Sequence, residues 1–160
     1  PVLGPGTSIT AATASPLTDG ASFMIVCSEN FAKRNKLTPI ARIVSGAVIG
    51  CDPEIMGIGP VEASRLALKR AKWTIEDIDI FELNEAFSSQ SIAVINELGI
   101  DIDKVNVDGG SLAIGHPLGA SGIRIIGKAA SILNRTNGNR ALASMCIGGG
   151  MGIAITLEKP

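Results

Sequence analysis

The 160-residue sequence is poor in the side chains that several protein classes require. Aromatic residues make up only 3%, tyrosine is absent, and the formal net charge is -1. Because no block of like charges could bind a polyanion or an anionic bilayer, we expect neither nucleic acid nor a membrane as a partner. No apolar run approaches the ~20 residues that span a bilayer. The longest, at 21–27, fits a buried strand better.

Cysteine and histidine are also scarce. Cys27, Cys51 and Cys146 lie far apart, and their odd number argues against a disulfide framework. With His116 as the only histidine, they do not form a zinc ligand set, and we expect no metal and no cofactor. A reducing compartment is expected, most simply the cytoplasm, with mitochondria as the alternative. Because the chain begins at Pro1 without an initiator Met, we expect a fragment or a processed product.

The sequence is rich in apolar residues, at 46%, and in glycine, with 19 residues. A chain of this length forms one core that buries roughly 70% of its unfolded surface. Strand and helix periodicities alternate, which predicts an α/β domain with a mixed sheet covered by helices on both faces. Residues 1–20 are rich in Gly, Pro, Ser and Thr and predict a leading loop, so the domain itself is assigned to 21–160.

Six strands and four helices are predicted. The strands are expected at 21–28, 41–50, 78–83, 105–107, 140–146 and 151–157. The helices are expected at 28–36, 61–72, 85–98 and after the glycine-rich stretch 108–122. Gly99 is placed to end the third helix in a left-handed conformation, and the last two strands form an antiparallel hairpin through the turn at 147–150.

Two residues in glycine-rich surroundings are candidates for chemistry. His116 lies between Gly115 and Pro117 before a helix, so it is either a base aimed by a stiffened loop or an ordinary hydrogen-bonded histidine. Cys146 ends an apolar strand and precedes three glycines, whose backbone N–H groups suit an oxyanion. It is equally well explained as a small buried apolar residue.

Other polar residues remain open on local evidence. Asn84 is either a helix N-cap or an amide that holds a water or a substrate carbonyl, and Glu85 could hold a neighbouring side chain. Ser15 and Met56 look locally like a loop hydroxyl and a core residue. The glycine-rich stretches lack the spacing of a P-loop or a dinucleotide fingerprint, so we reject a nucleotide site.

Three sequence blocks together resemble the signature blocks of the thiolase family. They are Asn84-Glu85-Ala86-Phe87, then Gly109-Gly110 with Gly115-His116-Pro117-Leu118-Gly119-Ala120-Ser121-Gly122, and then Cys146-Ile147-Gly148-Gly149-Gly150. Their order and separations also match, and the resemblance covers nearly the whole chain. It implies a thiolase-like half that catalyses acyl transfer between acyl-CoA and CoA, by Claisen condensation or thiolytic cleavage. Coenzyme A would be part of the substrate rather than a cofactor.

The resemblance also implies roles for individual residues. His116 would activate a nucleophilic cysteine and, with a water held by Asn84, form an oxyanion hole. Cys146 would be the second acid/base, with a pKa lowered by glycine N–H groups and His116, and the N–H of Gly148 would bind a tetrahedral intermediate. The remaining implied residues line the substrate tunnel: Ser15, Ala14, Ala86 and Phe87 around the pantetheine, and Met56 at the acyl end.

Family members carry two similar halves and an inserted loop, and the nucleophilic cysteine belongs to the N-terminal half. Residues 1–20 would therefore be the tail of that insertion, and 21–160 the C-terminal half. We expect the isolated chain to be inactive, to expose an apolar face toward the N-terminal half, and to form homo-oligomers within a complete enzyme. Two alternatives stay open: a ketoacyl-synthase-type condensing enzyme, which typically uses two histidines, and a non-catalytic domain that binds coenzyme A or a partner.

Overall fold

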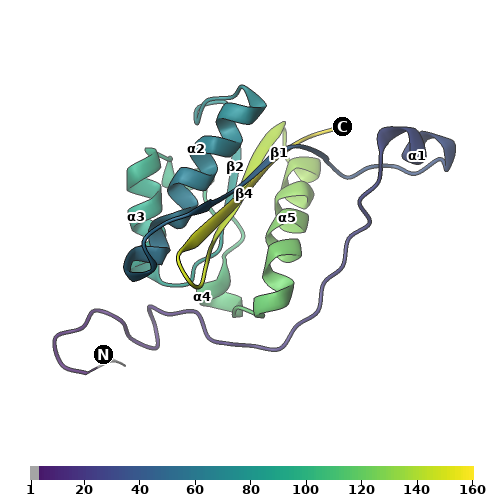
Figure 1. The fold of residues 1–160 in the computed structure, drawn as a ribbon. Coiled ribbons are helices and arrows are strands. Elements are labelled where there is room, and N and C mark those ends of the chain that lie inside the picture. The colour runs from purple at the N-terminus through teal and green to yellow at the C-terminus, as the bar shows by residue number, and fades with distance from the viewer. Residues whose placement is uncertain (1–3) are drawn as a thin grey trace.

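The computed structural model describes residues 4–160, so the first three residues of the expected leading loop lie outside the description. Its centre is a four-stranded sheet with the order β1-β4-β3-β2 (Figure 1). The β4 strand pairs antiparallel with both β1 and β3, whereas β2 pairs parallel with β3. The sheet is therefore mixed, as predicted. The strands are β1 (Arg42–Gly50), β2 (Ile80–Leu83), β3 (Arg140–Ile147) and β4 (Met151–Glu158).

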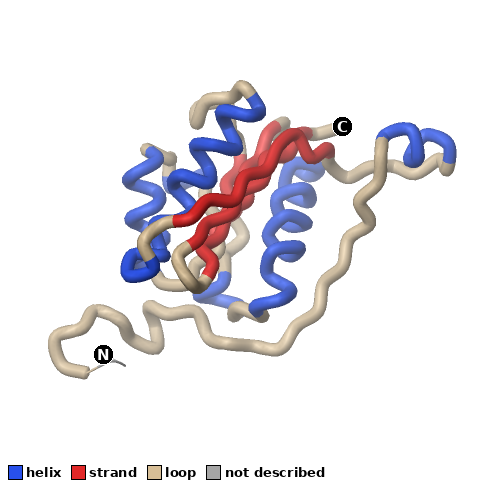
Figure 2. Tube along the Cα trace, viewed as in Figure 1, coloured by secondary structure: helices blue, strands red, loops and turns tan. Residues whose placement is uncertain are grey.

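Helices cover both faces of the sheet, which confirms the predicted layers (Figure 2). On one face Phe81 of β2 packs with Val61 of α2 (Gly59–Ala71) and Val94 of α3 (Ser88–Leu98). On the other face the neighbouring Ile80 packs with Ile132 of α5 (Leu118–Arg135). Successive residues of a strand point to opposite faces, so this short apolar strand fills two cores. The shorter helices are α1 (Glu29–Arg34), α4 (Ser111–Ile114) and the 3-10 turns Pro53–Ile58 and Ile102–Lys104.

Several predicted boundaries are confirmed by local chain chemistry. Ser28 caps α1 by accepting a hydrogen bond from the N–H of Phe31, and Pro60 stands in the first turn of α2. Gly99 ends α3 with a φ of 66°, in the left-handed region that glycine adopts without steric cost. The hairpin between β3 and β4 is also as predicted.

The predicted strand at 21–28 is wrong. These residues form neither strand nor helix, and Phe23 is 92% exposed. Figure 1 shows the leading segment running past α4 and α5 to α1, which stands away from the sheet. An apolar, β-prone segment becomes a strand only where another strand supplies its hydrogen bonds, and no strand within residues 4–160 pairs with it.

The predicted strand at 105–107 is also wrong, so residues 4–160 form four strands in place of the six predicted. Val105 makes only a single bridge to Phe81. Asn106 then adopts a positive φ of 46°, which ends any extended run. Its side-chain amide instead bonds the backbone of Leu83, accepting from the N–H at 2.8 Å and donating to the carbonyl at 2.9 Å. One amide side chain thus replaces a neighbouring strand at the end of β2. The predicted helix at 85–98 begins at Ser88, three residues later than expected.

Candidate active site

Two of the predicted site residues lie at the carboxyl end of the parallel pair β2 and β3. Asn84 directly follows β2, and its N–H donates to the carbonyl of Ser144 in β3 at 2.9 Å. Cys146 lies two residues farther along β3. His116 joins this edge because its Nε2 atom lies 3.4 Å from the Nδ2 atom of Asn84. The structure therefore brings residues from three separate sequence blocks to one edge of the sheet.

His116 is fixed on both its backbone and its ring. Its N–H donates to the carbonyl of Pro16 at 2.8 Å, and its Nδ1 atom lies 2.6 Å from the Oγ atom of Ser121, in the first turn of α5. Gly115 precedes it with a φ of 93°, and a Cβ there would lie 2.3 Å from the side chain of Thr18. Only glycine fits both that conformation and that close contact.

The electrostatic surroundings of the two predicted acid/base residues differ. Burial, and then the positive charge of Arg124, lower the pKa of His116, so the imidazole is neutral at pH 7. Burial raises the pKa of the Cys146 thiol, and the nearby Cys51 adds to the effect. This direction corrects the expectation that glycine N–H groups and His116 would lower the pKa of Cys146. In this chain, desolvation of the thiolate outweighs the backbone hydrogen bond that favours it.

Asn84 is buried, and its carboxamide is held from behind. Its Oδ1 atom accepts a hydrogen bond from the hydroxyl of Ser111 at 2.7 Å. The same Ser111 oxygen accepts from the Nη2 atom of Arg124 in α5 at 2.6 Å. Sequence reasoning missed Ser111, Ser121 and Arg124. Only Ser121 carried a signal, because it lies in the quoted block five residues after His116.

The predicted holding role of Glu85 is confirmed. Its carboxylate accepts a hydrogen bond from the amide of Asn106 at 2.7 Å and another from the backbone N–H of Leu112 at 3.0 Å. A Cβ on Gly110 would lie 2.5 Å from this carboxylate, so glycine is required there for the close approach. Glu85 therefore ties the end of β2 to the loop that leads to His116.

Four of the five predicted substrate-contacting residues come together. The N–H of Ser15 donates to the carbonyl of Ala86 at 3.0 Å, and Ala14 pairs with Phe87 as an antiparallel bridge. Leu17 forms a parallel bridge with His116, so the same segment reaches both loops. We call residues 13–18 the strap. Its Ser15 is half-buried, and the Ser15 hydroxyl donates to the carbonyl of Ala86 at 3.4 Å.

The remaining predicted residues, Met56 and Gly148, belong to segments next to β3, the strand that carries Cys146. Met56 belongs to the 3-10 turn Pro53–Ile58, which packs against β3, β4 and α3. Cys51 donates from its Sγ atom to the carbonyl of Met56 at 4.0 Å. Gly148 is exposed in the hairpin turn two residues after Cys146. These observations locate the residues, while the roles assigned to them stay predictions.

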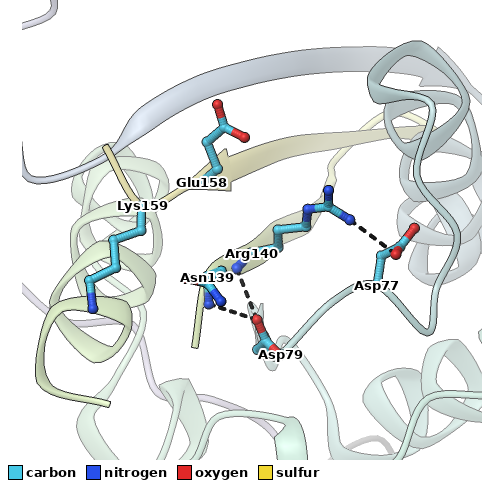
Figure 3. A pocket seen from close by; sticks show the side chains of 6 residues that line it. All are labelled: Asp77, Asp79, Asn139, Arg140, Glu158 and Lys159. Carbon is cyan, nitrogen blue, oxygen red and sulfur yellow. Dashed lines mark hydrogen bonds and ion pairs between the residues drawn. The ribbon is translucent and has the colours of Figure 1, made fainter. Parts of the chain in front are cut away.

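A polar hollow of about 460 Å³ lies at the opposite end of β3 (Figure 3). There Arg140 forms an ion pair with Asp77 at 3.0 Å and lies 4.5 Å from the ring of Trp73. Asp79 accepts hydrogen bonds from the N–H groups of Asn139 and Arg140 at 2.7 and 3.0 Å. These charged groups bond to one another and to the backbone where β2 and β3 begin. None of the predicted site residues lines the hollow.

Comparison with known proteins identifies the family. Residues 37–159 match the family described as "Thiolase, C-terminal domain". The chain belongs to the thiolase family. This thiolase domain is 51% identical over 153 residues to an acetyl-CoA acetyltransferase of Paracoccus denitrificans, covering 96% of the chain and 39% of that relative. A mouse relative named "Acetyl-CoA acetyltransferase, cytosolic" is 47% identical over 156 residues, covering 98% of the chain and 39% of that relative.

Solved structures give the same assignment. The acetyl-CoA acetyltransferase of Bacillus anthracis superposes with a TM-score of 0.93 at 45% identity, covering 96% of the chain and 39% of that structure. Human mitochondrial 3-ketoacyl-CoA thiolase in complex with CoA superposes with a TM-score of 0.88 at 44% identity, with the same coverages of 96% and 39%. The chain therefore spans about two fifths of these relatives, and the expected thiolase fold is confirmed.

Residues 4–160 contain neither a helix that could span a membrane nor a cluster of metal-ligating side chains. No described helix has both the length and the apolar character needed to cross a bilayer. In the same part of the chain, no three His, Cys, Asp or Glu side chains gather as they would around a metal ion.

Proposed function

We propose that this chain is the C-terminal catalytic half of a thiolase, which transfers acyl groups between acyl-CoA and CoA. The reaction is Claisen condensation or the thiolytic cleavage of a 3-ketoacyl-CoA. The observation that supports it is the contact of Asn84 with His116 at the end of the sheet where β3 carries Cys146, in a chain of the thiolase family. The named thiolase relatives favour this reaction over the ketoacyl-synthase alternative.

In this proposal His116 acts first as a base. Its neutral ring accepts the proton of a nucleophilic cysteine, and the resulting imidazolium can donate to a thioester oxygen. A water held by Asn84 supplies the second donor. The α-carbon of a thioester is a very weak acid, and one such donor typically contributes about 2.7–4 kcal/mol to stabilising the developing oxyanion.

Cys146 serves as the second acid/base. Because burial raises its pKa, the resting group is the neutral thiol, which is the form that protonates the carbanion released in cleavage. In condensation the thiol first gives its proton to the CoA thiolate that leaves when the acyl group moves to the nucleophilic cysteine, and the resulting Cys146 thiolate then removes the α-proton of acetyl-CoA. The N–H of Gly148 contributes to the oxyanion site for the acyl-transfer intermediate.

The substrate is a coenzyme A thioester, and no separate cofactor takes part. Ala14 and Ser15 of the strap, together with Ala86 and Phe87, line the pantetheine tunnel, and Met56 lies at the acyl end. Their support is positional, because the strap is hydrogen-bonded beside the histidine loop. One similar structure is described as a complex with CoA, which favours the same ligand here.

The N-terminal part of the relatives supplies the nucleophilic cysteine and covers the apolar surface that this half exposes. Ile25 is 79% and Leu118 is 64% exposed, on the leading segment and at the start of α5. The complete enzyme then assembles as a homo-oligomer. Its compartment stays a prediction, since one relative is named cytosolic and another mitochondrial.

A complementation assay tests the proposal. The isolated chain is incubated with acetoacetyl-CoA and CoA, alone and with a separately produced N-terminal thiolase half. We expect turnover only with both halves, and its loss in His116→Ala and Cys146→Ala. Turnover by the isolated chain, or turnover by the pair that survives both substitutions, would contradict the assignment. Ser64→Ala, which removes a buried hydroxyl of α2 that has no hydrogen-bond partner within residues 4–160, controls for a substitution elsewhere in the core.

A further inference from the structure

A row of hydrogen-bonded polar side chains lies behind the candidate active site and contacts it only at Asn84. It begins at Arg124 in α5, passes through the hydroxyl of Ser111 and ends on the Oδ1 atom of Asn84. Ser111 is completely buried and Asn84 is 1% exposed, so the hydroxyl hydrogen of Ser111 needs an acceptor within the protein. The proposed reaction assigns no role to Ser111 or Arg124.

The direction of these hydrogen bonds is set by the cation. A guanidinium group can only donate, so the Ser111 oxygen must be the acceptor toward Arg124. The single hydroxyl hydrogen of Ser111 is then left to donate, and the Oδ1 atom of Asn84 lies in its path at 2.7 Å. If the carboxamide were flipped, its NH2 group would face Ser111 and the hydroxyl hydrogen would lose this acceptor.

The orientation of Asn84 in turn sets the state of the histidine ring. With Oδ1 toward Ser111, the Nδ2 atom faces the Nε2 atom of His116 at 3.4 Å and can only donate. Nε2 must then carry the lone pair. The other ring nitrogen carries the hydrogen, which fits its 2.6 Å contact with the Ser121 oxygen, because the Ser121 hydroxyl donates to the carbonyl of Pro117 at 3.3 Å.

We propose that Ser111 and Arg124 are positioning residues that orient the Asn84 carboxamide and thereby hold His116 in the tautomer with hydrogen on Nδ1 and a lone pair on Nε2. This inference rests on the proposed function, since that tautomer is the one that presents a base to a nucleophile. Ser111 and Arg124 touch no reacting atom and act only through Asn84.

The tautomer can be measured directly because His116 is the only histidine in the chain. Long-range ¹H–¹⁵N correlation spectra of the ¹⁵N-labelled chain, recorded above the pKa of the ring, distinguish the two nitrogens. We expect Nδ1–H to predominate in the wild type. Ser111→Ala removes the hydrogen bond that holds Oδ1, so the ratio of the two tautomers should shift toward Nε2–H by about fivefold, the effect of one neutral hydrogen bond.

Matched variants separate positioning from simple loss of stability. Arg124→Met should move the tautomer ratio in the same direction, because the Ser111 hydroxyl is then free to reverse. Ser111→Thr, which keeps the hydroxyl, should restore the wild-type ratio. Ser64→Ala removes another fully buried serine hydroxyl, in α2, and should leave the ratio unchanged. Fluorescence of Trp73 and circular dichroism verify that each variant is folded.

An unchanged tautomer ratio in folded Ser111→Ala would overturn this inference and leave the proposed function untouched. A wild-type ring with hydrogen on Nε2 would overturn it as well. In the complemented enzyme, Ser111→Ala should lower kcat about fivefold with KM little changed, in line with loss of a correctly aimed base. If the tautomer shifts as expected while the complemented wild type fails to cleave acetoacetyl-CoA, the proposed function fails and the positioning role stands.

Discussion

The buried carboxyl of Glu82 should make the domain less stable as the pH rises. Glu82 is 1% exposed on β2, and its Oε1 atom has no hydrogen-bond partner within residues 4–160. Burial raises the pKa of Glu82 from 4.5 to about 7, although Lys128 and Arg124 oppose that shift. The folded domain therefore keeps a proton that the unfolded chain releases between these two pH values.

The size of the effect follows from the shift. One pKa unit corresponds to about 1.4 kcal/mol, so ionising Glu82 costs the folded state on the order of 3 kcal/mol. The unfolded chain binds fewer protons in this range, so the Glu82 contribution to the unfolding free energy falls as the pH rises from 4.5 to about 7. Above that range both states are ionised and the contribution stays constant.

The assay compares wild type with Glu82→Gln, whose side chain is uncharged at every pH. Urea unfolding is followed by the fluorescence of Trp73, the only tryptophan. The unfolding free energy of the variant minus that of the wild type should rise by on the order of 3 kcal/mol between about pH 4 and pH 8. Glu97→Gln, an exposed change in α3, controls for the loss of one formal charge. A difference that is flat or falls over this range would refute the reasoning.

Three further changes test other parts of the structure. Gly115→Ala should destabilise the domain by about 1–3 kcal/mol and release the strap at Thr18, because alanine resists the positive φ. Thermal unfolding and limited proteolysis measure the two effects, and an unchanged melting temperature would contradict the prediction. Asn106→Ala should cost about 2–4 kcal/mol in urea unfolding, because buried groups at the end of β2 lose their partners, and a loss below about 0.5 kcal/mol would count against that role. Cys146 should react with iodoacetamide more slowly than the exposed Cys27 at pH 7 and gain reactivity only in alkaline solution, because burial raises the pKa of Cys146. Equal labelling of the two cysteines at pH 7, measured by mass spectrometry, would disprove this.

Much of the fold could be predicted because its signals are local. Pro60 in the first turn of α2, Gly99 after α3 and the glycines of the last hairpin act through neighbouring residues only. The strand prediction for residues 21–28 failed for the opposite reason. Their apolar pattern is typical of a strand, but strand formation depends on a partner that must come from elsewhere in space.

The candidate site shows the same division. Asn84, His116 and Cys146 could be named from three motifs, and the structure brings them to one edge of the sheet. The support behind Asn84 could not be predicted, because Ser111 and Arg124 meet it only after α5 packs on the sheet. The direction in which the pKa of Cys146 shifts could not be predicted either. It depends on the burial of the thiol, which the three glycines after Cys146 do not reveal.

The strap has a consequence for the order in which the domain is made. Ser15 leaves the ribosome before its hydrogen-bond partner Ala86, which follows 71 residues later. The parallel neighbour of β2 is later still, since β3 begins only at Arg140. During synthesis the strap therefore stays undocked until β3 has emerged and paired with β2, so the substrate side of the site cannot assemble before most of the domain has been made.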